Sequence, residues 1–410
     1  EQRQWMDAYV HARINYAAFG DTRLAAQTLK QMAQSQRADG LTMMAAPGDF
    51  ALAGFTNIPD FCLYWIMMIA DYTLYTGKND GVDALFPSVV KAIRWFEDQL
   101  NDESLLTDVP HWVFVDWAEL DKHGQVTALN AHFVAALRAA TQLAQIVEQP
   151  REAGRFSALA DKISLAINTL LWDEQRGVYA DARNHSRLSH RISQQANAAV
   201  IAYGVAPRER WARIFETILD DGRLVLTRLS SREGLPVAFD EERNVVLAQP
   251  FYMQVLHQAM RAAGLQDKIV KNIRARWAAM LETGDSTFWE NWQLEDNTSK
   301  CHAWSASPVF DLSTDVLGIA PVAPGFRRVR IAPNLAGLEW ARGTYPTPHG
   351  VIAVEWKRDA DRLNLKIDVP KGCEAQIICP LLGGWTMADG ETVSGQATLP
   401  GGQGTHHFVG

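Results

Sequence analysis

The nine residues GIAPVAPGF, at positions 318–326, mark the point where the chain changes from one hydrophobic pattern to another. Before them, segments such as TALNAHFVAALRAATQLAQIVE (127–148) repeat apolar residues at the spacing of an amphipathic helix. After them, GVIAVEWKR (350–358) and DRLNLKIDVP (361–370) alternate apolar and polar residues, as half-buried strands do. The sequence therefore predicts a large helical part followed by a small antiparallel β domain.

The helical part is predicted to close on itself. Helical patterns follow one another from residue 1 to about residue 320, and PDFCLYWIMMIADYTLYTG (59–77) starts with proline and ends with glycine, as helices prefer. A repeat of fixed length is not visible, which disfavours a regular solenoid. A closed array of helical hairpins, an α/α barrel, fits better. The β part is interpreted as a structural sandwich.

Composition excludes several classes of protein. The chain has 410 residues, 47% of them hydrophobic, which is enough for a large core and more than one domain. A formal net charge of −8 argues against a nucleic-acid partner. The longest apolar run, 61–70, is too short to span a bilayer, so no membrane partner is expected. Four cysteines without a CxxC pair favour a reducing compartment, and we expect a cytoplasmic location.

Motifs for cofactor and metal chemistry are missing from the sequence. It contains no GxGxxG after a strand, no GxxxxGK[ST] and no GxSxG nucleophile elbow. It also contains no HExxH, and its eleven histidines are scattered. We therefore expect neither a cofactor nor a metal.

What stands out is carboxylates beside aromatic residues at positions typical of loops. The chain has 14 tryptophans, and three clusters combine them with acids: GDSTFWENW (284–292), HWVFVDW (111–117) and EQRQWMD (1–7). In the first, Glu290 lies between Trp289 and Trp292. Each of these patterns alone more often indicates a surface carboxylate beside a buried indole, or a turn. The three together indicate a common site.

The combination of indoles and carboxylates is suited to sugars. The C–H face of a pyranose stacks on an indole, and its hydroxyl groups need charged acceptors. Hydrolysis of a glycosidic bond usually needs two carboxyl groups, one as acid and the other as base or nucleophile. A tryptophan beside a carboxyl group lowers the local polarity and favours its protonated form.

The order of these motifs resembles a known family. FWENW followed by SKCHAWSASPVFDLSTDVLGIAPVAPGFRRVRIAP (299–333) is similar to the α-L-rhamnosidases of glycoside hydrolase family 78, and so is VDWAELDKHGQVTALNAHFVAALRAATQLA (115–144). The resemblance implies an (α/α)6 barrel of six hairpins over 1–322 and a C-terminal β-sandwich over 323–410. It also implies exo-acting release of terminal α-L-rhamnose with inversion.

The resemblance also implies roles for individual residues. Glu290 matches the general base, His302 a histidine that contacts the sugar, and Trp117 and Trp65 match tryptophans that line the pocket. Trp289 and Asp116, which flank these positions, join the expected sugar-binding set.

The first seven residues resemble the acid motif of the family. Glu1 and Trp5 fit its spacing, whereas Asp7 comes one residue early. Glu1 is the first choice as general acid, with Trp5 and Asp7 as sugar ligands, and the roles of Glu1 and Asp7 are exchangeable on this pattern. Closure of a barrel would bring Glu1 and Glu290 to the same mouth. Carboxyl groups about 6.5–9.5 Å apart would indicate inversion, and about 5–5.5 Å retention.

The sequence leaves other functions open. A different exo-glycosidase, a phosphorylase or a lyase would use the same kind of barrel, although no phosphate site and no basic pocket is readable. A catalytically silent carbohydrate-binding barrel is a second class, and a helical protein-interaction array a third. The expected partner is a small-molecule or oligosaccharide rhamnoside, with a homodimer left open.

Overall fold

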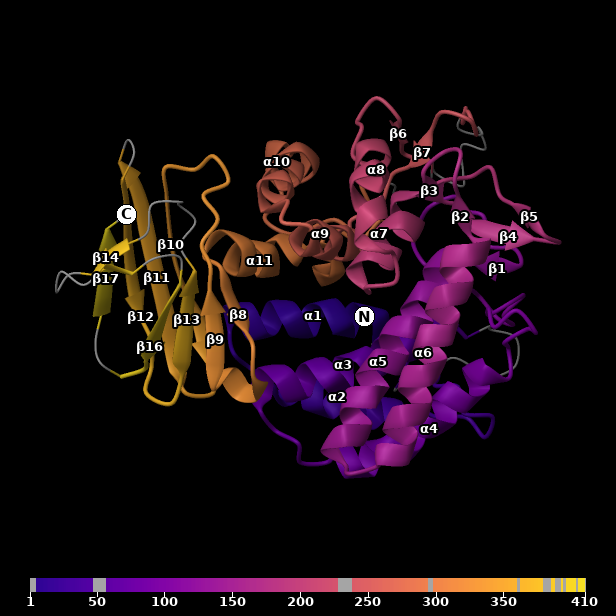
Figure 1. Cartoon of the computed structure of the whole chain (residues 1–410), viewed down its shortest axis with the longest axis horizontal. Coiled ribbons are helices and arrows are strands. Elements are labelled where there is room, and N and C mark those ends of the chain that lie inside the picture. The colour runs from indigo at the N-terminus through magenta and orange to yellow at the C-terminus, as the bar shows by residue number, and fades with distance from the viewer. Residues whose placement is uncertain are drawn as a thin grey trace.

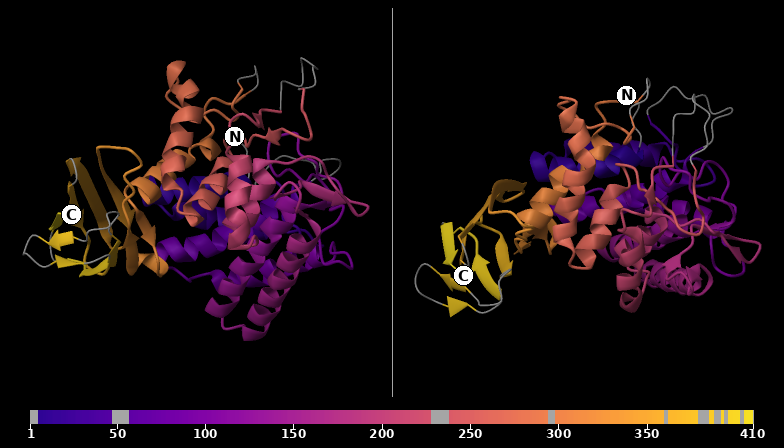
Figure 2. Two further views of the ribbon diagram at one scale, coloured as in Figure 1. Left: turned by 45° about the horizontal axis from the view of Figure 1, so that its top comes forward. Right: turned by 90° about the horizontal axis from the view of Figure 1, so that it is seen from above.

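The computed structural model describes residues 5–46, 57–227, 238–293, 298–359, 362–378, 385–387, 392–393, 396–402 and 405–409. Figure 1 shows a body of helices with a β domain at one end, where the C-terminus lies. Both views in Figure 2 keep the β domain to one side of the helices, so neither part encloses the other. The predicted division into a helical part and a β part is confirmed.

Six helices form a closed inner ring. Each packs on the next and the last packs on the first, in the order α1 (Trp5–Ala18), α3 (Pro59–Thr76), α5 (Thr127–Ile146), α7 (Gln194–Ala202), α9 (Met253–Ala262) and α11 (Ser307–Asp311). The interior helices α3 and α5 are buried around most of their circumference. α3 has a nearly continuous apolar sequence, whereas α5 has an amphipathic spacing and also buries polar residues such as Asn130 and His132. This ring is the inner wall of the predicted barrel.

The remaining helices pack on the outside of that ring. α2 contacts α1 and α3, α4 and α6 contact α5, α8 contacts α7, and α10 contacts α9. They show one buried face and one exposed face, as expected of helices that cover a core from outside. Their bounds are α2 Arg23–Gln34, α4 Val82–Glu97, α6 Pro150–Leu170, α8 Arg208–Ile218 and α10 Gln266–Glu282.

Short strands join the helices, which the helical pattern did not predict. They form three small sheets: β1 (Gln125–Val126) with β4 (Ala182–Asn184) and β5 (Arg187–Leu188); β2 (Trp172–Asp173) with β3 (Val178–Tyr179); and β6 (Leu224–Val225) with β7 (Val245–Val246). Figure 1 places them at the end of the molecule away from the β domain.

The β domain is a sandwich of two sheets. The larger sheet has the order β10 (Trp340–Thr347), β11 (Gly350–Asp359), β12 (Arg362–Asp368), β17 (Thr405–Val409), β14 (Trp385–Met387) and β15 (Thr392–Val393). The smaller has the order β16 (Gln396–Pro400), β13 (Glu374–Ile378), β9 (Arg328–Ile331) and β8 (Ile319–Pro321). Pairing is antiparallel as predicted, except between β9 and β13, which run parallel. Trp356 and Leu365 are buried in its core.

The stretch 318–326 connects the two parts through its glycines. The short π-helix η2 (Leu312–Val316) follows α11, and β8 begins at Ile319. Gly318 has φ +78°, and a Cβ there would lie 2.1 Å from the carbonyl carbon of Ala332. Trp356 Nε1 donates to the Val316 carbonyl at 3.1 Å, tying β11 to the end of the helical part. Among the described residues, no helix combines the length and apolarity needed to cross a bilayer.

Candidate active site

Glu290 lies in the long connection between α10 and α11 and is held by several hydrogen bonds. Its Oε1 accepts the indole N–H of Trp117 at 3.2 Å, and its Oε2 accepts the backbone N–H of Ser299 at 3.3 Å. Its backbone N–H donates to the Ser299 carbonyl, and its carbonyl accepts Trp304 Nε1 at 3.0 Å. The half-buried carboxylate is thus fixed in direction while part of it stays accessible.

A cluster of aromatic rings includes the two tryptophans that hydrogen-bond to Glu290, Trp117 and Trp304. The Trp304 ring, 3% exposed, lies 5.1 Å from that of Phe251 and parallel to that of Phe114. Phe114 packs edge-on against Trp117 at 4.9 Å, and Trp112 adds a further ring 5.5 Å from Trp117. The expected aromatic wall is therefore present, but Phe114, Trp112 and Trp304 contribute to it as well as Trp117.

Asp7 and His302 join the start of the barrel to its end. Asp7 lies in the first turn of α1 and is 7% exposed, and its Oδ2 is 3.3 Å from His302 Nε2. The His302 ring lies 4.4 Å from the ring of Trp304, which holds the Glu290 backbone. The structure thus brings Asp7, His302, Trp117 and Glu290 together, as barrel closure requires.

The site occupies the end of the ring at which its inner helices begin. Asp7 lies at the start of α1, the segment around Trp117 precedes α5, and the segment around Glu290 precedes α11. Asp7, in the first turn of α1, is favoured there by unpaired backbone N–H groups and the positive end of the helix dipole. The Trp117 and Glu290 segments reach the same mouth because they are the connections that lead into α5 and α11.

Asp116 is placed behind the aromatic wall. It is 1% exposed, and its Oδ2 accepts the Gln249 N–H at 2.9 Å and Gln195 Nε2 at 2.7 Å. Its Oδ1 accepts the Trp117 N–H at 2.9 Å. Burial outweighs these donors and raises its pKa to about 6. Asp116 therefore orients the Trp117 and Gln249 segments; with so little exposed surface it offers little to a sugar directly.

Asp60 was missed by the sequence interpretation. It is fully buried in the first turn of α3 and accepts the N–H groups of Phe114 at 2.9 Å and Val115 at 3.1 Å. Val115 has φ +54°, an unfavourable conformation for a β-branched residue. Lys122 Nζ donates to the Phe114 carbonyl at 2.6 Å. Burial raises the pKa of Asp60 and lowers that of Lys122. The two hold the strained turn that presents Trp117.

The remaining predicted residues lie elsewhere or outside the described part. Trp65 is 1% exposed and donates its indole N–H to the Leu29 carbonyl at 3.3 Å, so it packs α3 against α2. Trp289 is 5% exposed, and its indole N–H donates to Asp285 Oδ2 at 2.8 Å. This bond lies within the segment that carries Glu290. Trp5 is the first residue of α1. Its side chain, and all of Glu1, lie outside the described residues.

A hollow in the surface begins three residues after Trp117. It encloses about 540 Å³ and is lined by Leu120, Asp121, His123, Ser189, His190, Arg191 and Glu241. Within the described ranges, no group of three or more His, Cys, Asp or Glu side chains is arranged to hold a metal ion. The arrangement around Glu290 is suited to removing a proton from a water molecule beside an apolar, ring-lined surface.

Comparison with known proteins gives a consistent result along the chain. Residues 1–311 match the bacterial alpha-L-rhamnosidase six-hairpin glycosidase domain, and residues 318–394 match the bacterial alpha-L-rhamnosidase C-terminal domain. An alpha-L-rhamnosidase of Alteromonas sp. (strain LOR) is 22% identical over 338 residues, covering 76% of this chain and 34% of that protein. One from Streptomyces avermitilis is 23% identical over 320 residues, covering 75% of this chain and 28% of that protein.

Solved structures are similar over most of the chain. A rhamnosidase of glycoside hydrolase family 78 from Bacillus sp. GL1 has a TM-score of 0.81 at 29% identity, covering 92% of this chain and 39% of that one. The Streptomyces avermitilis alpha-L-rhamnosidase, solved with L-rhamnose, has a TM-score of 0.77 at 18% identity, covering 100% of this chain and 38% of that one, which supports the fold alone. The chain spans about a third of the length of these curated relatives. By its two matched domains, it belongs to the bacterial alpha-L-rhamnosidase six-hairpin glycosidase family.

Proposed function

We propose that this chain carries the catalytic barrel of an exo-acting glycoside hydrolase that releases terminal α-L-rhamnose from rhamnosides with inversion. The observation that carries the proposal is the Glu290 carboxylate, held by Trp117 and Ser299 beside a wall of aromatic rings. L-Rhamnose has a methyl group in place of a hydroxymethyl group, so an apolar wall suits it. The match to the bacterial alpha-L-rhamnosidase family model, and two relatives named alpha-L-rhamnosidase, support this choice of sugar.

The proposed mechanism is a single displacement. Glu290 acts as general base and removes a proton from the water that attacks the anomeric carbon. A second carboxyl group protonates the departing glycosidic oxygen. Asp7 lies beside His302 in the wall of the site, which supports Asp7 as a sugar ligand. Glu1 stays the first choice as the acid because of its spacing from Trp5 in the sequence.

The test is hydrolysis of p-nitrophenyl α-L-rhamnoside beside a panel of other p-nitrophenyl glycosides. Release from the rhamnoside alone is expected, with kcat lowered roughly 10²–10⁴-fold in Glu290→Gln because the general base is lost. Glu282→Gln, at the exposed end of α10, is the matched control and should retain wild-type turnover. A proton NMR spectrum recorded during turnover should show the anomer of inverted configuration first.

Two results would contradict the proposal. Wild-type turnover by Glu290→Gln would remove the proposed base. Release of a different sugar in preference to rhamnose would assign the barrel to another exo-glycosidase.

A further inference from the structure

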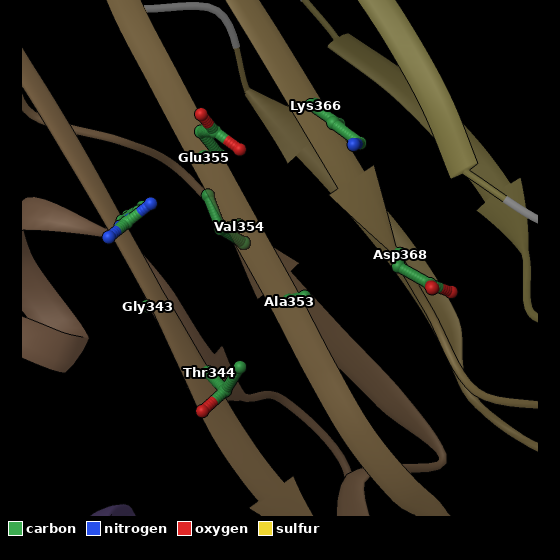
Figure 3. Close-up of a pocket in the computed structure, with 8 residues that line it drawn as sticks. Gly343, Thr344, Ala353, Val354, Glu355, Lys366 and Asp368 are labelled. Carbon is green, nitrogen blue, oxygen red and sulfur yellow. The ribbon is translucent and has the colours of Figure 1, made fainter.

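The outer face of the larger sheet of the β domain carries a polar hollow. Along β10 and β11, side chains alternate between the buried core and solvent, so Arg342 and Thr344 share the outer face with Ala353 and Glu355. The register places Arg342 opposite Glu355, and Glu355 opposite Lys366 of β12. In Figure 3 the side chains of Thr344, Glu355, Lys366 and Asp368 stand over three adjacent strands.

The hollow encloses about 450 Å³, within the range of about 300–1,000 Å³ typical of small-molecule sites. Its floor is made by the strand backbone at Gly343 and by the small outer-face side chains of Thr344 and Ala353, which lie between the longer side chains. Larger side chains at positions 344 and 353 would fill the space, whereas a side chain at position 343 would point inward at Leu317. A ligand in the hollow therefore contacts the strand backbone at the centre and charged side chains around the edge.

Four charged side chains surround this floor: Arg342, Glu355, Lys366 and Asp368. They stand on neighbouring strands, yet within the described part of the chain none of the four forms an ion pair or a side-chain hydrogen bond with another residue. Two are cationic and two anionic, so the hollow has donors and acceptors but no net charge. Such a set favours a neutral ligand that has many hydroxyl groups over an ion of either sign.

An exposed indole lies beside the hollow. Trp340 is 58% exposed and precedes Arg342 by two residues in β10, which places it on the same face about 7 Å along the strand. A solvated outer face accounts for charged side chains on an antiparallel sheet. It gives no reason for an exposed tryptophan at the rim of a concave surface.

We propose that this face of β10, β11 and β12 is a non-catalytic binding site for a neutral oligosaccharide. The C–H face of one sugar ring stacks on Trp340. Hydroxyl groups of the neighbouring residues donate to Glu355 and Asp368 and accept from Arg342 and Lys366. The site lies in a different domain from Glu290, so it would hold the glycan chain while a terminal residue is cleaved elsewhere.

The experiment is native electrophoresis of the whole chain through gels that contain a soluble β-glucan, a galactomannan or a polygalacturonate. Retardation by at least one of the two neutral polysaccharides is expected, and it should persist in high salt. Titration calorimetry with oligosaccharides of that polysaccharide then gives the dissociation constant. Trp340→Ala should weaken binding about tenfold, because a ring-stacking contact is lost. Leu165→Ala, which removes an apolar side chain on α6 that is 69% exposed, should bind as the wild type does.

Glu355→Gln is the second variant, and it should also weaken binding, through loss of a charged acceptor, without changing the fold as judged by circular dichroism. Absence of retardation by both neutral polysaccharides would overturn the inference. So would equal binding by Trp340→Ala, or stronger, salt-sensitive binding of the polygalacturonate. Because the readout is binding rather than hydrolysis, these outcomes do not depend on the proposed function, and turnover of the p-nitrophenyl rhamnoside should be unchanged in both variants.

Discussion

At the scale of single residues, the Glu290 carboxylate is oriented by the Ser299 N–H and by one side-chain donor, the indole N–H of Trp117. Trp117→Phe keeps a ring but removes the donor to Oε1. We expect kcat for the p-nitrophenyl rhamnoside to fall about tenfold, the equivalent of about 1.4 kcal/mol in the activation barrier. Trp112→Phe is the matched control, because the Trp112 indole N–H donates to no group among the described residues. Equal losses in the two variants would mean that ring packing matters rather than the hydrogen bond.

Asp116 should make stability depend on pH. Its pKa is raised from 3.8 to about 6 by burial, so the folded state binds the proton more tightly than the unfolded chain. Its contribution to the free energy of unfolding is therefore complete below pH 3.8 and is lost as the pH rises through about 6. The loss amounts to about 3 kcal/mol.

Asp116→Asn cannot titrate and should lose less stability than the wild type between about pH 4 and about pH 7. Urea unfolding of both proteins at the two pH values measures the difference. Asp83→Asn, an exposed acid in the first turn of α4, should keep the wild-type pH dependence. The same dependence in Asp116→Asn and the wild type would show that Asp116 is not the titrating group.

Sequence patterns identified candidate site residues in loops and at helix starts, but gave no reliable information on the roles of residues inside helices. Glu290, Asp7 and Trp117 stood out because acids and indoles occurred together at loop positions, and the structure brings them together. The resemblance placed Trp65 in the sugar pocket, whereas the structure shows it buried in the middle of an apolar helix, bonded to the Leu29 carbonyl. Asp60 follows a proline at a helix start, so it resembled an ordinary first-turn acid. Only the fold reveals that it holds the Val115 turn.

At the scale of secondary structure, long periodic segments were predictable and short ones were not. The interior helices α3 and α5 and the strands β11 and β12 match the expected segments closely. The strands β1 to β7 have two or three residues each, too few to establish an alternation. Two of the three sheets pair strands that are 20 or more residues apart in the sequence, in the connections between helices, which no local pattern encodes.

The connection between helical part and β domain depends on two glycines that touch. Gly77 ends α3 with φ +68°, Gly325 has φ +68°, and a Cβ on Gly325 would lie 3.0 Å from the Cα of Gly77. Gly325→Ala should therefore lower the free energy of unfolding by about 1–3 kcal/mol, through backbone strain and the close contact.

Thermal and urea unfolding measure that effect. Gly154→Ala is the matched control, since Gly154 lies within α6 and has nothing within 4 Å of an added Cβ. It should be stabilising by about 0.5–1 kcal/mol because alanine favours the helix. A neutral Gly325→Ala would show that the two backbones separate at little cost.

At the scale of the whole molecule, the site exists only if the ring of inner helices closes. Asp7 comes from the first inner helix, and Glu290 and His302 from the segment before the last. Contacts of α11 with α1 and α9 complete the ring. The sequence predicted this closure from successive helical segments without a fixed repeat, and closure in turn predicted that the carboxylate clusters near the two ends of the helical part would meet. It did not indicate what holds α11 in place.

A buried cluster of charged side chains holds α11 in place. Arg261 of α9 donates to Asp311 at 2.9 Å and to Asp315 at 2.6 Å, and His257 Nδ1 lies 2.6 Å from Asp311. Arg261→Leu would leave the two buried carboxylates without their cation, so the free energy of unfolding should fall by about 3–5 kcal/mol. Arg276→Leu, whose partner Asp221 is exposed, should cost no more than about 1 kcal/mol. Urea unfolding compares the two. Because the cluster positions α11, the folded Arg261→Leu protein should also turn over rhamnoside more slowly. Wild-type stability in that variant would instead mean that packing of α11 on α1 alone closes the ring.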